Sequence, residues 1–164
     1  MGFVIFENEL KMDPKKVVAI ASWPPPKILF EVQSFHGLVS FYGKFIKNFS
    51  GICAPMFDTI KKTNQPFHWT EMVEKSFQLL KNKITERPIL RLPDFNKLFQ
   101  VCCDANGIAI GAVLSQEDKP VSYFSEKLNE GMQKYTSYDK EFNVVVQPLK
   151  HWRHYLLANE FSYF

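Results

Sequence analysis

Two acidic residues stand at positions that could serve a metal-dependent hydrolase. Asp104 closes a β-rich run, and Glu141 lies in the first turns of a predicted amphipathic helix. Two carboxylates that approach each other repel unless they share a proton or a cation. Hard oxygen ligands of this kind suit Mg²⁺ or Mn²⁺. If the helix packs across the strand, the pair could hold such an ion and activate water against a phosphodiester.

The same two acids also have an ordinary structural interpretation. An acid near the start of a helix is stabilised by the helix dipole, and an acid at the end of a strand is common turn chemistry. The residues alone leave both interpretations open. Other metal chemistry has less support, because no spacing of cysteine and histidine resembles a zinc site. The three cysteines, two of them adjacent, argue against a disulfide framework and fit a reducing compartment.

A second pattern interleaves lysines with aromatic residues in the first half of the chain. Residues 1–93 hold 13 lysines and arginines against 8 acids, whereas residues 94–164 hold 7 against 9. A basic first part suits contact with a polyanion such as nucleic acid. The candidate backbone-binding residues are Lys44, Lys47, Lys61 and Lys62. The alternative is that the lysines form a solvated surface and the aromatic residues, at helical spacing, belong to the core.

The first part of the chain has the pattern of a helical domain. The chain has 164 residues, 46% apolar and 23% charged, which is typical of a globular protein. Asp13-Pro14 predicts a helix over residues 15–22, stopped by Trp23-Pro24-Pro25-Pro26. Apolar spacing predicts further helices over 30–41, from about Pro55, and over 71–84 with Thr70 as its cap.

The texture changes after residue 93. Three β-rich runs, 98–104, 108–115 and 120–125, predict an antiparallel meander with turns at Asn106-Gly107 and Glu117-Asp118-Lys119. A long helix is predicted over 137–157, with a buried stripe that includes Phe142 and Trp152. A fourth strand begins near Glu160, so the second domain is expected to be truncated at its C-terminal end. The expected fold class is α+β or α/β.

At this point particular motifs carry a family resemblance over nearly the whole chain. In the first part they include Met12-Asp13-Pro14, Trp23-Pro24-Pro25-Pro26-Lys27 and Phe67-His68-Trp69-Thr70, and in the second part Cys103-Asp104-Ala105, residues 110–117 and 120–129, Tyr138-Asp139-Lys140-Glu141 and His154-Tyr155-Leu156. In this order the segments resemble the Pol polyprotein of gypsy-class LTR retrotransposons. The first part resembles the reverse-transcriptase thumb and connection, and the second part resembles the ribonuclease H domain.

The resemblance implies a division of the chain and a chemistry. Residues 1–12 would end the polymerase palm, 13–93 would form the helical thumb and connection, and 94–164 would form a ribonuclease H-like domain. The family's reactions are RNA-directed DNA synthesis and metal-dependent hydrolysis of RNA in RNA–DNA hybrids. Asp104 and Glu141 would be the first two catalytic acids and ligands of Mg²⁺ or Mn²⁺. The implied partners are an RNA–DNA hybrid or template–primer duplex and the remainder of the polyprotein.

Several departures from the family pattern predict little or no hydrolysis. The polymerase Tyr-x-Asp-Asp motif and the third ribonuclease H aspartate do not occur in these residues. Ile28 replaces the expected capping serine or threonine three positions before Glu31, and Pro148 falls inside the long predicted helix. The alternative function is a non-catalytic nucleic-acid-binding remnant that uses the basic thumb. Without a secretory signal or an apolar span, an intracellular location without membrane contact is expected.

Overall fold

The computed structural model describes residues 2–61, 66–105, 109–133, 137–157 and 160–163, with the backbone alone at 105, 130, 133 and 137–141. The first elements are β1 (Phe3–Phe6), β2 (Glu9–Met12), α1 (Pro14–Ala21), α2 (Leu29–Ser40), the 3₁₀ turn η1 (Gly43–Phe45), α3 (Phe49–Lys61) and α4 (Glu71–Thr85). They are followed by β3 (Ile89–Arg91), β4 (Phe99–Ala105), β5 (Ala109–Gln116), β6 (Lys119–Lys127), α5 (Glu130–Gln133), α6 (Ser137–His151), α7 (Arg153–Leu156) and β7 (Phe161–Tyr163). The mixed α+β fold class expected from the sequence is confirmed.

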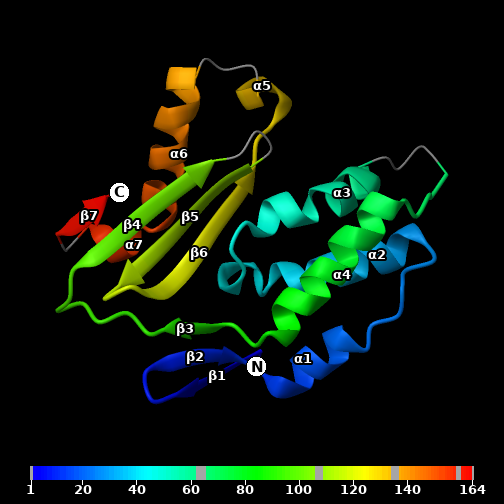
Figure 1. Ribbon diagram of the computed structural model, residues 1–164, viewed down its shortest axis with the longest axis horizontal. Coiled ribbons are helices and arrows are strands. Elements are labelled where there is room, and N and C mark those ends of the chain that lie inside the picture. The colour runs from blue at the N-terminus through cyan, green and yellow to red at the C-terminus, as the bar shows by residue number, and fades with distance from the viewer. Residues whose placement is uncertain (1, 62–65, 106–108, 134–136, 158–159, 164) are drawn as a thin grey trace.

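The elements from β1 to β3 form a helical unit (Figure 1). Strands β1 and β2 pair through a tight turn at Glu7 and Asn8, whose φ angles of 47° and 64° match the twist of a two-residue hairpin. The hairpin then pairs with β3, which follows α4. Residues 2–12 thus join the helices in one core, with Met12 at 5% exposure.

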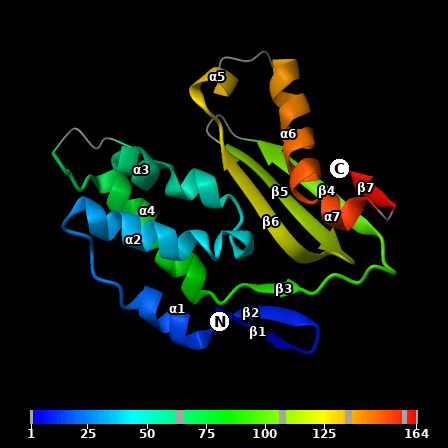
Figure 2. The same cartoon turned by 180° about the vertical axis from the view of Figure 1, so that it is seen from behind.

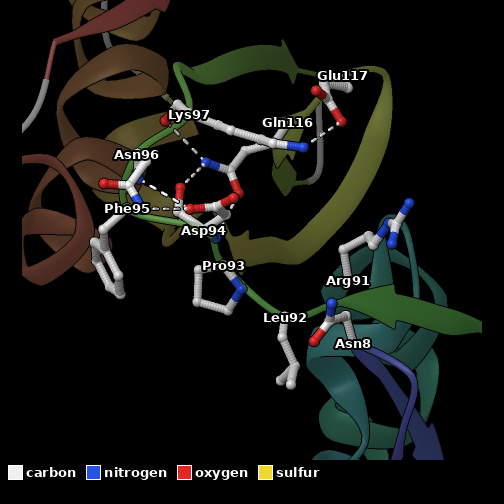
Figure 3. A pocket seen from close by; sticks show the side chains of 10 residues that line it. All are labelled: Asn8, Arg91, Leu92, Pro93, Asp94, Phe95, Asn96, Lys97, Gln116 and Glu117. Carbon is white, nitrogen blue, oxygen red and sulfur yellow. Dashed lines mark hydrogen bonds and ion pairs between the residues drawn. The ribbon is translucent and has the colours of Figure 1, made fainter.

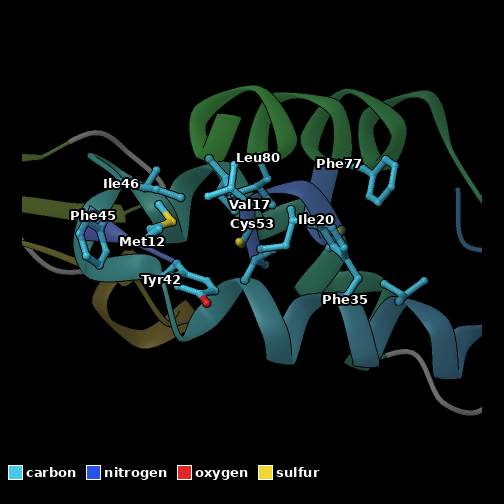
Figure 4. Packing of buried hydrophobic residues seen from close by; sticks show 14 of the residues in the cluster. Met12, Val17, Ile20, Phe35, Tyr42, Phe45, Ile46, Cys53, Phe77 and Leu80 are labelled. Carbon is cyan, nitrogen blue, oxygen red and sulfur yellow. The ribbon is translucent and has the colours of Figure 1, made fainter. Parts of the chain in front are cut away.

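The core of the helical unit is built from aromatic and aliphatic side chains of α1, α2, α3 and α4 (Figure 4). The centre of the Phe77 ring lies 4.6 Å from that of Phe35 and 5.7 Å from that of Trp69. The predicted stripe of α4 is fully confirmed, because Val73, Phe77, Leu80 and Ile84 are all buried. Thr70 caps this helix as expected, since its Oγ1 accepts from the Val73 N–H at 3.3 Å.

The elements from β4 to β7 form a sheet unit. Strands β4, β5 and β6 make the predicted antiparallel meander, and β7 pairs in parallel with β4, giving the order β6-β5-β4-β7. Helix α6 covers one face of this sheet (Figure 2), where Trp152 packs among Val101, Leu114 and Leu156. The predicted turn at Glu117 and Asp118 is present, while Asn106-Gly107 lies outside the described residues.

Three local predictions were wrong. Helix α3 starts at Phe49, not near Pro55, and contains that proline. The long helix over 137–157 is divided at Trp152 into α6 and α7, and Pro148 lies within α6. Phe142 is 64% exposed and does not belong to a buried stripe. As predicted, Ile28 gives α2 no side-chain cap, although Glu31 still accepts from the Lys27 N–H at 2.7 Å.

The covalent connection between the two units is held by one buried glutamine (Figure 3). The Gln116 side chain is 5% exposed; its Oε1 accepts from the Asp94 N–H at 3.0 Å, and its Nε2 donates to the carbonyls of Asp94 at 2.8 Å and Lys97 at 3.0 Å. Lys97 also pairs with Glu117 at 2.9 Å. These residues line a cavity of about 420 Å³. Their hydrogen bonds and ion pair hold the connecting residues 92–97 against β5 and the turn that follows it. In the ranges that the structure describes, no helix has the length and apolar composition needed to cross a membrane.

Candidate functional site

A cavity of about 470 Å³ lies between the helical unit and strands β4 and β5 of the sheet unit. The helical unit contributes Lys47, Asn48, Ile52, Leu79 and Lys83, and the sheet unit contributes Cys102, Asp104, Ala109, Gly111, Ala112 and Val113. We call this cavity the cleft. Its charged lining consists of two ammonium groups and one carboxylate, so its formal charge is positive. A wall of this kind attracts anions, and its apolar residues exclude water from part of the surface.

Asp104 reaches the cleft because of the alternation of side chains along β4. Neighbouring residues of a strand point to opposite faces. Cys102 and Asp104 therefore share the face that lines the cleft, whereas Val101 and Cys103 pack in the core beneath α6. Asp104 is exposed and pairs in the ladder with Gly111. It occupies the end of the first strand of the meander, as the sequence predicted.

Glu141 lies in α6, as predicted, but its side chain is outside the described part of the structure. Helix α6 packs on the face of the sheet opposite to the one that lines the cleft. Whether the carboxylates of Asp104 and Glu141 meet therefore stays a prediction. Within the described ranges, no group of three or more His, Cys, Asp or Glu side chains could hold a metal ion.

The structure separates the predicted nucleic-acid-binding lysines into distinct environments. Lys47 is exposed and lines the cleft. The Lys44 Nζ lies 4.2 Å from the centre of the Phe3 ring, and burial lowers the pKa of Lys44. The Lys61 Nζ lies 4.6 Å from the centre of the Phe57 ring, while Lys62 lies outside the described residues. Of the three predicted lysines that the structure describes, Lys47 is the one that lines the cleft.

Lys83 is a cleft residue that sequence reasoning missed. It lies on α4 and makes an exposed ion pair with Glu86 at 3.1 Å. A signal for it does exist, because Leu79 is apolar but lies outside the buried stripe of α4, and Lys83 follows four positions later. Residues at this spacing share one face of a helix. Leu79 is 43% exposed and lines the cleft together with Lys83.

The three cysteines differ sharply in access, and all are free. Cys102 is exposed on the sheet side of the cleft. Cys53 is buried in the helical core, and desolvation raises its pKa to about 12. Desolvation raises the pKa of Cys103 to about 11, against the opposing effect of a hydrogen bond with Tyr163. Because thiolates are the reactive form, Cys102 is the natural chemical reporter of the cleft.

Comparison with known proteins identifies the family. The model of the RNase H-like domain found in reverse transcriptase matches residues 69–163, more than half of the chain. The chain belongs to this family of RNase H-like domains. The match begins at Trp69, before α4, so the RNase H-like domain family model extends from the helical unit into β7.

Curated relatives of this RNase H-like domain are retrotransposon polyproteins. The chain is 40% identical over 162 residues to the Pol polyprotein of transposon 297 and 36% identical over 170 residues to that of transposon gypsy, both from Drosophila melanogaster. It is 34% identical over 161 residues to the transposon Tf2-3 polyprotein of Schizosaccharomyces pombe. These matches cover 95% or more of this chain but only 12–16% of the relatives. The resemblance to a segment of a gypsy-class Pol polyprotein is confirmed.

Solved structures show the same fold across both units. The foamy viral protease-reverse transcriptase in complex with RNA/DNA hybrid matches with a TM-score of 0.89 at 20% identity, covering 99% of this chain and 23% of that one. The foamy viral protease-reverse transcriptase dRH in complex with double-stranded DNA matches equally well, over 29% of its chain. At this identity the likeness concerns the fold, and it includes the placement of the helical unit beside the sheet unit.

The half-buried His36 predicts that the stability of the fold depends on pH. His36 on α2 lines a neighbouring cavity with Phe57, Glu126 and Lys127, and desolvation lowers its pKa. The folded state then binds fewer protons than the unfolded state at mildly acidic pH. The stability that the neutral ring contributes is fully present above the unfolded-state pKa of His36. It is lost as pH falls from that pKa towards the lower folded-state pKa.

We therefore expect the free energy of unfolding to fall between about pH 7 and about pH 5, and to fall less in His36→Gln. Urea unfolding at both pH values measures the difference. His68→Gln, which changes an exposed histidine, serves as the comparison. An unchanged pH response in His36→Gln would show that His36 does not contribute. His151, whose pKa desolvation also lowers, would then be the next candidate.

Proposed function

We propose that this chain holds a nucleic-acid duplex within a retrotransposon Pol polyprotein, with Lys47 and Lys83 contacting phosphates at the cleft. The observation that carries this proposal is the convergence of two lysines from separate segments on one cavity between the units. Ammonium groups bind the phosphate backbone without regard to sequence. The fold agrees, because neighbours that share both units are complexes with RNA/DNA hybrid and double-stranded DNA.

The proposal assigns the parts of the chain to regions of the polyprotein. Residues 1–12 would end the polymerase palm, 13–93 would be the thumb and connection, and 94–164 the RNase H-like domain. The pairing of β2 with β3 and the shared core would make the palm segment part of the same folded body as the thumb. The cleft would then lie between a thumb wall and an RNase H-like wall.

The proposal is tested by titrating a labelled duplex with the full chain at several salt concentrations. Affinity should fall steeply with salt, with a logarithmic slope of about −2 if two phosphates are contacted, because each contact contributes about −0.9. An RNA–DNA hybrid and a double-stranded DNA of the same sequence should both bind. Absent binding, or binding that salt does not weaken, would refute the proposal.

Metal-dependent hydrolysis is the second candidate function, since the family uses divalent metal ions and Asp104 has an exposed carboxylate at the expected strand end. The described residues do not fit a metal centre, because the cleft presents one carboxylate together with two ammonium groups. Binding of Mg²⁺ or Mn²⁺ by Asp104 and Glu141 together remains a proposal.

We accordingly expect a protein of residues 1–164 not to cut a labelled RNA–DNA hybrid in the presence of Mg²⁺ or Mn²⁺. The third catalytic aspartate that the family resemblance implies does not occur in these residues, so at most two of the three expected acids would hold the metal pair that clamps the attacking and leaving oxygens. Gel analysis of the labelled RNA strand measures cutting, with Asp104→Asn as the matched control. Cutting by the unmodified chain that disappears in Asp104→Asn would establish hydrolysis.

A further inference from the structure

The corner between η1 and α3 brings Lys47 to the cleft. At this corner Asn48 adopts a φ of 56°, the left-handed conformation that asparagine tolerates better than most residues. Its carbonyl accepts from the Ile52 N–H at 3.1 Å and so begins α3. Its side chain lies against Gly51, where a Cβ would come within 2.5 Å of the Asn48 Oδ1. The backbone next to Lys47 therefore has a tightly defined shape.

A second set of contacts attaches this corner to the sheet unit. The Ser50 N–H donates to the Ser125 Oγ at 3.0 Å, and the Ser50 Oγ donates to the Ser125 carbonyl at 2.8 Å. The first N–H groups of a helix have no partner within the helix. Ser125 on β6, 75 positions away, thus caps the first turn of α3. About two turns later on α3, Asp58 forms an ion pair with Lys127, also on β6.

These two contacts, Ser50 with Ser125 and Asp58 with Lys127, define the α3–β6 seam. It lies where the helical unit meets the edge strand of the sheet, as both views of the ribbon show (Figures 1 and 2). Ser125 itself lines the neighbouring cavity, together with His36 and Phe57, while Lys47 lines the cleft. Ser125 also pairs in the ladder with Gly111, which lines the cleft opposite Asp104, so the seam begins on the sheet face that carries the cleft and joins it to the first turn of α3.

We propose that Ser125 is a positioning residue of the cleft. By holding the first turn of α3 against β6, it sets the separation between Lys47 and the sheet face that carries Cys102 and Asp104. The consequence for nucleic-acid binding rests on the proposed function, whereas the consequence for cleft geometry does not. Asp58 and Lys127 stabilise the same arrangement farther along α3, so the Ser125 cap determines the end of the helix nearest to Lys47.

The test uses Cys102 as a reporter in the full chain. We compare Ser125→Ala with Ser125→Thr, which keeps the hydroxyl, and with Ser34→Ala, which removes a local hydrogen bond on α2. The alkylation rate of each cysteine by N-ethylmaleimide is followed by mass spectrometry of peptides without added nucleic acid. N-ethylmaleimide should alkylate Cys102 about threefold to tenfold faster in Ser125→Ala than in the unmodified chain. This range corresponds to the net free energy of one lost hydrogen bond. Ser125→Thr and Ser34→Ala should match the unmodified chain.

Cys53 distinguishes a positioning role from simple destabilisation. Because it is buried in the helical core, global unfolding would raise its alkylation in parallel with that of Cys102. An unchanged rate at Cys102 in Ser125→Ala would overturn the proposal. So would equal acceleration of Cys102 and Cys53, or a Ser125→Thr rate as high as that of Ser125→Ala.

A duplex titration of the same variants links the seam to function. Ser125→Ala should bind the duplex about threefold to tenfold more weakly, with a salt slope smaller by about one, as expected for the loss of one phosphate contact. If the unmodified chain binds no duplex, the proposed function fails, and the alkylation rates still decide the role of Ser125. Faster alkylation combined with unchanged affinity and slope would overturn the link between the seam and binding.

Discussion

Replacing Lys47 and Lys83 together by glutamate is expected to weaken binding of a duplex by about tenfold to a hundredfold. Each substitution removes a cation from the cleft and adds an anion beside Asp104. The logarithmic salt slope should shrink by about two, because each lysine that contacts a phosphate contributes about one. Fluorescence anisotropy of a labelled duplex over a range of salt concentrations measures both quantities.

A charge-matched control separates the cleft from overall electrostatics. Lys15 and Lys75 lie on α1 and α4 and are exposed outside the cleft. The double variant Lys15→Glu and Lys75→Glu changes the net charge by the same amount and should bind almost as the unmodified chain does. Equal losses in the two double variants would mean that the duplex responds to net charge, and the cleft would lose its assigned role.

Replacing Phe77 by alanine is expected to lower the free energy of unfolding by about 3–5 kcal/mol. Phe77 is fully buried in the helical core, where its ring packs against that of Phe35 (Figure 4). The Trp69 ring lies against it as well. The truncation leaves a cavity that the surrounding helices fill only in part. Such a loss is a large share of the roughly 5–15 kcal/mol that stabilises a typical domain.

Urea unfolding followed by tryptophan fluorescence measures this loss. Met72→Ala on the same helix is the control, because Met72 is 69% exposed and its truncation should change stability by no more than about 0.5 kcal/mol. A similar small change in Phe77→Ala would contradict the packing described for the helical core.

Regular periodicity made α4 and the meander predictable from sequence. The stripe on α4 repeats at helical spacing and begins at a capping threonine, so local chemistry and burial agree. The strands alternate and are separated by turn residues, as at Glu117 and Asp118. Asp104 could be placed at a strand end for the same reason, and the family motifs around it were recognisable without coordinates.

Predictions failed where a distant segment supplied the deciding contact. Helix α3 starts at Phe49 because its first turn is capped by Ser125 from the sheet, and no local signal announces a partner so far along the chain. The ammonium groups of Lys44 and Lys61 lie beside the aromatic rings of Phe3 and Phe57, although both lysines are exposed, and their contact with nucleic acid stays a prediction.

The residues in order were sufficient to determine the class of fold, the family and the strand that ends in Asp104, because these depend on periodicity and motifs over short stretches. Only the tertiary structure showed that Lys83 lines the cleft with Lys47 and that Asp104 faces the helical unit. It also showed that Gln116 binds the connection between the units and that Ser125 binds the first turn of α3. These features depend on contacts between residues far apart in sequence. Such contacts are set by the packing of one unit on the other, which local patterns do not encode.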